Sequence, residues 1–303
     1  MGHFALLLTL SIAVTAGGGT IRPAPDAAAR GLGVNMPLVA RLTGAGNVLY
    51  VTTLDVSNHS PVDTQVDFYF DGVNSATGAP VVITGSVALG GLRQQGDGKL
   101  RARSNAHFED FIAALADAQM LPAEAVTQGV VGSALFVFNN LTKSGQGAVT
   151  ARFKNDLAGG TVGVALRGRE MTSSEPQRLV VAVRDTRGNS RGEAEVYPNL
   201  FINHTGLTLS GTGTTTPVTV ELSAVSNTTG QSVGVPVTLS IHAGNTAIIG
   251  SLTQALQIPA GAEDTFLVYA RVTSGDAAIH GIVSQVDAVT RDGSVFEMSR
   301  ADF

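Results

Sequence analysis

The chain has 303 residues, of which only 14% are charged, and it carries a net charge of −5 with three lysines. The length permits two domains of ordinary size, and an acidic chain without a basic patch argues against nucleic acid as a partner. Cysteine is absent, which excludes a disulfide scaffold and a lipoprotein with an acylated cysteine. The chain is rich in Gly, Thr, Val and Ser, a composition that favours strands and turns over long helices.

The N-terminus has the pattern of an export signal. Residues 1–16 contain an apolar run from Phe4 to Val14 and end on small residues, which predicts a signal peptide cleaved after Ala16 and a secreted or cell-surface protein. A short membrane anchor is the alternative interpretation. No later apolar run is long enough to span a bilayer, so no transmembrane segment is expected after signal removal. Residues 17–35 are rich in Gly, Ala and Pro and predict a flexible arm, with a donor strand for a neighbouring subunit as the alternative.

The first domain is expected at 36–171. In Val48–Phe70, apolar and polar residues alternate in two runs on either side of a turn at 58–63, a pattern that predicts a hairpin. The residues expected to face the core are Tyr50, Leu54 and Val56 in the first run and Val66, Phe68 and Phe70 in the second. Pro37–Leu42 is expected to be an edge strand, and Val81–Leu89 a further strand. The period changes in 104–120, where Phe108, Phe111, Ile112 and Leu115 predict one short amphipathic helix capped by Ser104 or Asn105.

Strands are expected to resume at 133–138, 148–153 and 161–166, followed by a linker at 172–178 that contains Pro176. The second domain, 179–303, again alternates throughout. Leu49–Asn58 aligns loosely with Leu200–Ser210, and Val149–Leu166 aligns with Gly281–Met298. We interpret these pairs either as a distant duplication or as ordinary sandwich patterning. The chain therefore predicts two antiparallel β-sandwiches in tandem.

Short motifs support a family resemblance. Several short stretches of the chain resemble a group of uncharacterised secreted bacterial proteins. These stretches are Pro37–Arg41, Tyr50–Asn58, Phe108–Phe111 leading into Gly132–Leu135, and Val283–Asp287 with Thr290–Gly293. Those proteins carry tandem immunoglobulin-like sandwich modules, alone or attached to exoenzymes. The resemblance implies an immunoglobulin-like fold and an extracellular location, and it brings no catalytic residues.

One catalytic pattern occurs. Gly188–Gly192 matches G-x-S-x-G, which in α/β-hydrolases exposes a nucleophilic serine, here Ser190, on a strand-to-helix turn. The residues that follow, 193–198, have no helical period, so a loop is the preferred interpretation. We therefore expect no catalytic residue and no enzyme.

Other chemistry-bearing residues do not converge in the sequence. The histidines are predicted to be hydrogen-bonded surface residues, because none has metal-ligand spacing, and neither metal nor cofactor is expected; they are His3, His59, His107, His204, His242 and His280. The adjacent acids Glu109–Asp110 and Glu263–Asp264 make no glycosidase pair. Calcium at 71–74 or 287–292 is an open alternative to solvated turns.

Glycan binding by secreted sandwiches usually needs exposed aromatic residues. The chain has no Trp and four Tyr (Tyr50, Tyr69, Tyr197 and Tyr269), of which Tyr69 is the best exposed candidate. Four sequons, at Asn58, Asn140, Asn203 and Asn227, are expected by chance. The leading hypothesis is a secreted, non-enzymatic structural or adhesive protein that self-associates through strand edges or contacts other surface proteins. The alternatives are a glycan- or protein-binding module and a hydrolase that uses Ser190.

Overall fold

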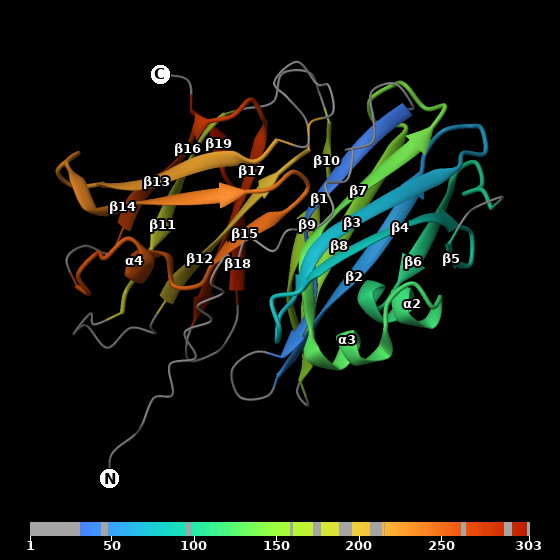
Figure 1. Ribbon diagram of the computed structural model, residues 1–303, viewed down its shortest axis with the longest axis horizontal. Coiled ribbons are helices and arrows are strands. Elements are labelled where there is room, and N and C mark those ends of the chain that lie inside the picture. Colours follow the sequence, from blue (N-terminus) through green and yellow to red (C-terminus); the bar gives the residue numbers. More distant parts are fainter. Residues whose placement is uncertain are drawn as a thin grey trace, which may run out of the picture.

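The protein is all-β with antiparallel sheets, as the sequence predicted (Figure 1). The computed structural model describes residues 31–43, 48–94, 98–157, 160–171, 177–187, 196–206, 214, 216–261, 265–287 and 293–301. The predicted signal peptide and residues 17–30 of the predicted arm lie outside this part of the chain. No helix among the described residues has the length and apolarity needed to cross a membrane.

Residues 31–171 form a first lobe around one hydrophobic core. Its strands and helices, in chain order, are β1 (Gly31–Thr43), β2 (Leu49–Asn58), β3 (Val66–Asn74), β4 (Pro80–Ala88), β5 (Gly91–Arg93), β6 (Ser104–Phe108), α2 (Phe111–Asp117), α3 (Ala123–Gln128), β7 (Val130–Asn139), β8 (Gly147–Leu157), β9 (Gly160–Arg167) and β10 (Arg169–Glu170). The strands form one continuous sheet in the order β5-β4-β3-β7-β1-β2-β8-β9, with β10 paired to β1 and β6 paired to β2. The sheet folds over at the short β1–β2 pairing, so that β5-β4-β3-β7-β1 forms one layer and β6-β2-β8-β9 the other, with the core between them.

β1 lies inside the sheet and is not the edge strand that the sequence suggested. It pairs with β7 along most of its length, and its other side pairs with β2 at 41–43 and with β10 at 34–35. It also begins at Gly31, so 31–35 is strand within the stretch that the sequence places in the arm. Pro37 is accommodated because the register shifts between Met36 and Val39, where a residue without an N–H costs no ladder hydrogen bond.

The predicted hairpin at Val48–Phe70 is wrong, although its alternation is right. Leu54, Val56, Phe68 and Phe70 are fully buried. However, β2 pairs with β1, β6 and β8, whereas β3 pairs with β4 and β7, so the two strands lie in different layers. The side-chain amide of Asn58 donates to the carbonyls of residues 62, 100 and 101 and holds the connection between the layers.

The predicted helix at 104–120 is shorter than expected. Residues 104–108 form β6, with Ala106 and Phe108 buried, and the helix α2 begins only at Phe111. Its N-cap is Asp110, which accepts a 3.0 Å hydrogen bond from the N–H of Ala113. Pairing with β2 therefore outcompetes the first turn of helix at these residues.

Residues 178–301 form a second lobe with its own core. Its elements are β11 (Arg178–Arg184), β12 (Val196–His204), β13 (Val218–Ser226), β14 (Ser232–Ile241), β15 (Thr246–Ile249), α4 (Leu252–Ala255), β16 (Thr265–Ser274), β17 (Ile279–Asp287), β18 (Gly293–Glu297) and β19 (Ser299–Arg300). They form the sheets β14-β13-β16-β11-β19 and β15-β12-β17-β18.

The two lobes repeat one topology. The order β4-β3-β7-β1-β10 in the first lobe corresponds to β14-β13-β16-β11-β19 in the second. The order β6-β2-β8-β9 in the first lobe corresponds to β15-β12-β17-β18 in the second. In both, helix follows the strand at the edge of the second sheet, as α2 follows β6 and α4 follows β15. The sequence stretches that align loosely occupy equivalent strands, β2 with β12 and the hairpin β8–β9 with β17–β18. This agreement favours duplication over generic patterning.

The lobes meet by sheet-to-sheet packing, and they lie side by side in Figure 1. The outer face of β15-β12-β17-β18 packs on the first lobe, where Ile282 is buried in that lobe's core and three further apolar side chains pack against it: Phe201, Ile248 and Val295. The inner face of the same sheet, with Leu200, Ile202 and Val283, belongs to the second core. This sheet is therefore covered on both faces.

Candidate functional site

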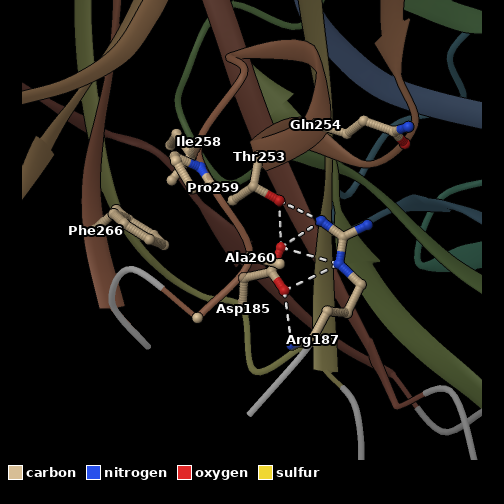
Figure 2. A pocket seen from close by; sticks show the side chains of 9 residues that line it. Asp185, Arg187, Thr253, Gln254, Ile258, Pro259, Ala260 and Phe266 are labelled. Carbon is tan, nitrogen blue, oxygen red and sulfur yellow. Dashed lines mark hydrogen bonds and ion pairs between the residues drawn. The ribbon is translucent and has the colours of Figure 1, made fainter.

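A pocket of about 320 Å³ opens at one end of the second lobe (Figure 2). It lies between the residues after β11, the helix α4 with the turn that follows it, and the start of β16. Its lining residues are Asp185, Arg187, Thr253, Gln254, Ile258, Pro259, Ala260, Gly261 and Phe266. The volume is at the lower end of the range for small-molecule sites.

The polar side of the pocket is an ion pair between Asp185 and Arg187. Asp185 is buried, and its two carboxylate oxygens accept from the Nε of Arg187 at 3.0 and 3.1 Å. The hydroxyl of Thr253 donates to the carboxylate and accepts from the guanidinium. The guanidinium also lies 5.7 Å from the ring centroid of Tyr197, close enough for a cation–π contact.

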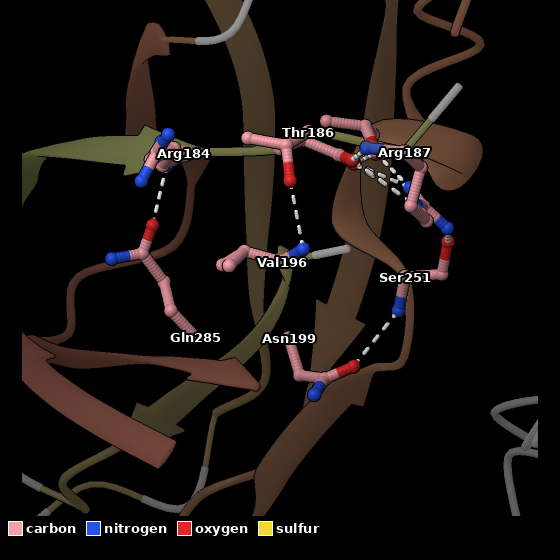
Figure 3. A network of polar contacts seen from close by, with 9 residues as sticks. Arg184, Thr186, Arg187, Val196, Asn199, Ser251 and Gln285 are labelled. Carbon is pink, nitrogen blue, oxygen red and sulfur yellow. Dashed lines mark hydrogen bonds and ion pairs between the residues drawn. The ribbon is translucent and has the colours of Figure 1, made fainter. Parts of the chain in front are cut away.

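The surrounding contacts hold this pair in place (Figure 3). Arg187 Nη1 donates to the hydroxyl of Ser251 at 2.7 Å, and the N–H of Ser251 donates to Asn199 at 3.0 Å. Thr186, between the two charged residues, bonds to Val196 through both its backbone and its hydroxyl. β11, β12 and the start of α4 are thus tied together at one point.

The pocket combines an occupied carboxylate with an apolar wall. The carboxylate of Asp185 is occupied by the N–H groups of Arg187 and by Thr253, which leaves it little capacity to act as a base. The opposite wall, made by Ile258, Pro259 and Phe266, is apolar. The sequence offered one signal for this pair, the Asp-x-Arg spacing, which puts both side chains on one side of an extended backbone.

A second polar cluster lies between the lobes. Asn35 donates to the side-chain oxygen of Asn203 at 2.7 Å, Asn203 donates to the hydroxyl of Ser133 at 3.0 Å, and Ser133 donates to the carbonyl of Gly244 at 2.6 Å. All three side chains are buried. His280 lies opposite Asn203 in the register of β12 and β17 and is 1% exposed. Sequence reasoning missed this cluster because its members are more than 60 residues apart.

The histidines do not all lie at the surface as predicted. His204 and His280 are buried, because the strand faces that carry them are covered by the rest of the molecule. His204 is hydrogen-bonded to Thr216 and accepts from the N–H of Gly206, and burial lowers its pKa. His59 and His107 are exposed as expected, and His3 lies outside the described residues.

His107 forms the centre of an exposed cluster. Its Nδ1 lies 2.8 Å from Asp55 and its Nε2 lies 3.1 Å from Glu109, which is also paired with Lys154. The hydrogen bond to Asp55, followed by that to Glu109, raises the pKa of His107. The described residues contain no group of three or more potential ligands placed to hold a metal.

The remaining candidates are dispersed. Tyr69 is half-buried and Tyr50 is stacked on Phe153, so the described residues present no aromatic platform at these positions. Asp71 and Asn74, considered for calcium, belong to β3 and not to a loop. Ser190 and the pair Glu263–Asp264 lie outside the described residues, as does most of 287–292. Two sequon asparagines, Asn58 and Asn203, are buried and cannot carry a glycan in the folded protein.

Comparison with models of known protein families finds no match, and comparison with curated proteins finds none either.

Proposed function

We propose that the chain is a secreted, non-enzymatic structural or adhesive protein of the cell surface, the matrix or an extracellular filament. The observation that carries this proposal is the packing of the outer face of β15-β12-β17-β18 on the first lobe, with Ile282 of the second lobe buried in the core of the first. A sheet covered on both faces holds the two lobes in one orientation. Such stiffness suits a protein that maintains spacing or transmits force.

Each lobe is proposed to be a Greek-key sandwich of the jelly-roll kind. The resemblance implied immunoglobulin-like modules, in which the first two strands share a sheet. Here β1 and β2 pair over only three residues before diverging into different layers, and β11 and β12 lie in different sheets. Most connections in the second lobe cross between the sheets, which supports the jelly-roll arrangement.

Light scattering after size exclusion and negative-stain imaging of the mature chain test the proposed role. We expect assemblies, or regular particles longer than one molecule, at high protein concentration. A monomer that stays monodisperse under these conditions and binds no surface component would overturn it.

A glycan- or protein-binding module is the second candidate, and the exposed face of β6-β2-β8-β9 favours it because several charged side chains gather there. A hydrolase that uses Ser190 is the third. Ser190→Ala tests it directly, since any esterase activity that persists unchanged in the variant removes this candidate.

A further inference from the structure

The outer face of β6-β2-β8-β9, here called the open face, is the counterpart of the sheet face through which the second lobe docks. In the second lobe that face carries Phe201, Ile248 and Ile282 and is covered. In the first lobe the same face is polar and exposed to solvent. Its side chains are Thr53, Asp55, Ser57, Asn105, His107, Thr150, Arg152, Lys154, Ala165 and Arg167.

The register places two arginines next to each other on this face. Thr150 on β8 is directly opposite Arg167 on β9, and Arg152 is opposite Ala165. Arg152 and Arg167 are therefore diagonal neighbours, with Thr150 beside both. Diagonal neighbours of this kind have their Cα atoms about 7–8 Å apart, so both guanidinium groups can reach one extended ligand.

Neither arginine is neutralised. Within the part of the chain that the structure describes, the side chains of Arg152 and Arg167 make no hydrogen bond or ion pair, and both residues are exposed. Asp55 of the open face accepts from Asn105 and His107, and the adjacent Glu109 pairs with His107 and Lys154, so both carboxylates are engaged elsewhere. The β8–β9 side of the face thus carries two exposed arginines without a charged partner among the described residues, on a chain of net charge −5.

We propose that the open face binds an acidic polysaccharide, with its sulfate or carboxylate groups held by Arg152 and Arg167. Guanidinium groups bind such anions by paired, charge-assisted hydrogen bonds. The hydroxyls of Ser57 and Thr150 are donors and acceptors for sugar hydroxyls, and the hydroxyl of Thr53, which donates to the carbonyl of Glu109, is an acceptor. The described residues of the open face include no Phe, Tyr or Trp side chain on which nucleic acid bases could stack.

This inference rests on the proposed adhesive role and gives it a ligand. The experiment measures binding of the full mature chain to dextran sulfate, polygalacturonate and neutral dextran by biolayer interferometry at two salt concentrations. We expect binding to at least one polyanion, weakening as salt rises, and none to neutral dextran. The sulfate and the carboxylate arms distinguish the two anion chemistries.

Arg152→Gln/Arg167→Gln is expected to lower the affinity at least about tenfold, since two charge-assisted contacts are lost. The matched control is Lys99→Gln/Lys143→Gln, which replaces two exposed lysines away from the open face and likewise changes the net charge from −5 to −7. We expect the control to bind within about twofold of the parent chain. Circular dichroism confirms that both variants are folded.

Equal losses in the two double variants would overturn the inference, because net charge alone would then explain binding. Equal binding to neutral dextran, or no binding of the parent chain to either polyanion, would overturn it as well. If the chain assembles but does not bind polyanions, the proposed structural role stands and the proposed polysaccharide ligand is contradicted. If the chain binds polyanions but stays monomeric, the proposed ligand stands and the proposed self-association is contradicted.

Discussion

The side chain of His280 is buried near the lobe interface without hydrogen bonds that would offset the loss of its contacts with water. Both of its ring nitrogens lack a hydrogen-bond partner within the described structure. Burial lowers its pKa to about 4, and the nearby charge of Arg169 acts in the same direction. The imidazole is therefore neutral in the folded protein at neutral pH, and its protonation opposes folding.

We predict that stability falls as the pH decreases from about 6.5 to about 4. In this range the unfolded chain takes up a proton at His280 and the folded chain does not, so about 3 kcal/mol of the free energy of unfolding is lost. Urea denaturation at several pH values measures this loss. His280→Leu is expected to remove that part of the pH dependence, whereas His59→Gln, at an exposed position, should keep it.

The ion pair in the pocket gives a second prediction at this scale. Asp185→Ala leaves the half-buried guanidinium of Arg187 without its carboxylate, and we expect the free energy of unfolding to fall by about 2–4 kcal/mol. Glu221→Ala is the control, because it removes the carboxylate of the exposed pair with Arg271 and should cost about 1 kcal/mol or less. Equal effects in denaturant titrations would show that the network around Arg187 adds no more stability than an exposed ion pair.

At the scale of elements, α2 depends on one residue at its start. It has seven residues, too few for a helix to be stable alone. It is held by burying Phe111, Ile112 and Leu115 and by the cap at Asp110, which also pairs with Arg41 of β1. The cap therefore connects the helix to the sheet that it covers.

Two substitutions separate the cap from the ion pair. Asp110→Ala removes both, and we expect a loss of about 1–2 kcal/mol in the free energy of unfolding. Asp110→Asn retains a good N-cap and removes only the charge, so its cost should be smaller by at least half. If both variants lose the same amount in denaturant titrations, the ion pair with Arg41 is the stabilising contact and the cap is not.

At the scale of the whole molecule, the repeated lobe is used asymmetrically. The second lobe docks through the face of β15-β12-β17-β18, whereas the equivalent face of the first lobe carries Arg152 and Arg167 and stays open. Charged side chains there disfavour docking of a further sheet in the same manner. The first lobe is therefore not expected to dock on another molecule through this face in the way that the second lobe docks on the first.

We predict that the lobes unfold in one cooperative step because they share this interface. Phe201→Asp places a charge in the apolar contact and should split the calorimetric transition into two. Ser240→Asp, on the exposed outer face of the other sheet of the second lobe, should leave one transition. Two transitions in the parent chain would contradict the prediction.

The sequence by itself determined the class of fold and the inward face of most strands. Leu54, Val56, Phe68 and Phe70 could be assigned to the core because alternation with a period of two is a local property of the chain. Only the tertiary structure decided which strands are neighbours: β2 and β3 follow each other closely yet lie in different layers. It also decided which polar residues are buried, as with Asn203 and His280, and which cations stay unpaired, as with Arg152 and Arg167. These outcomes depend on the pairing and packing of distant segments, and a pattern read along the chain contains no such information.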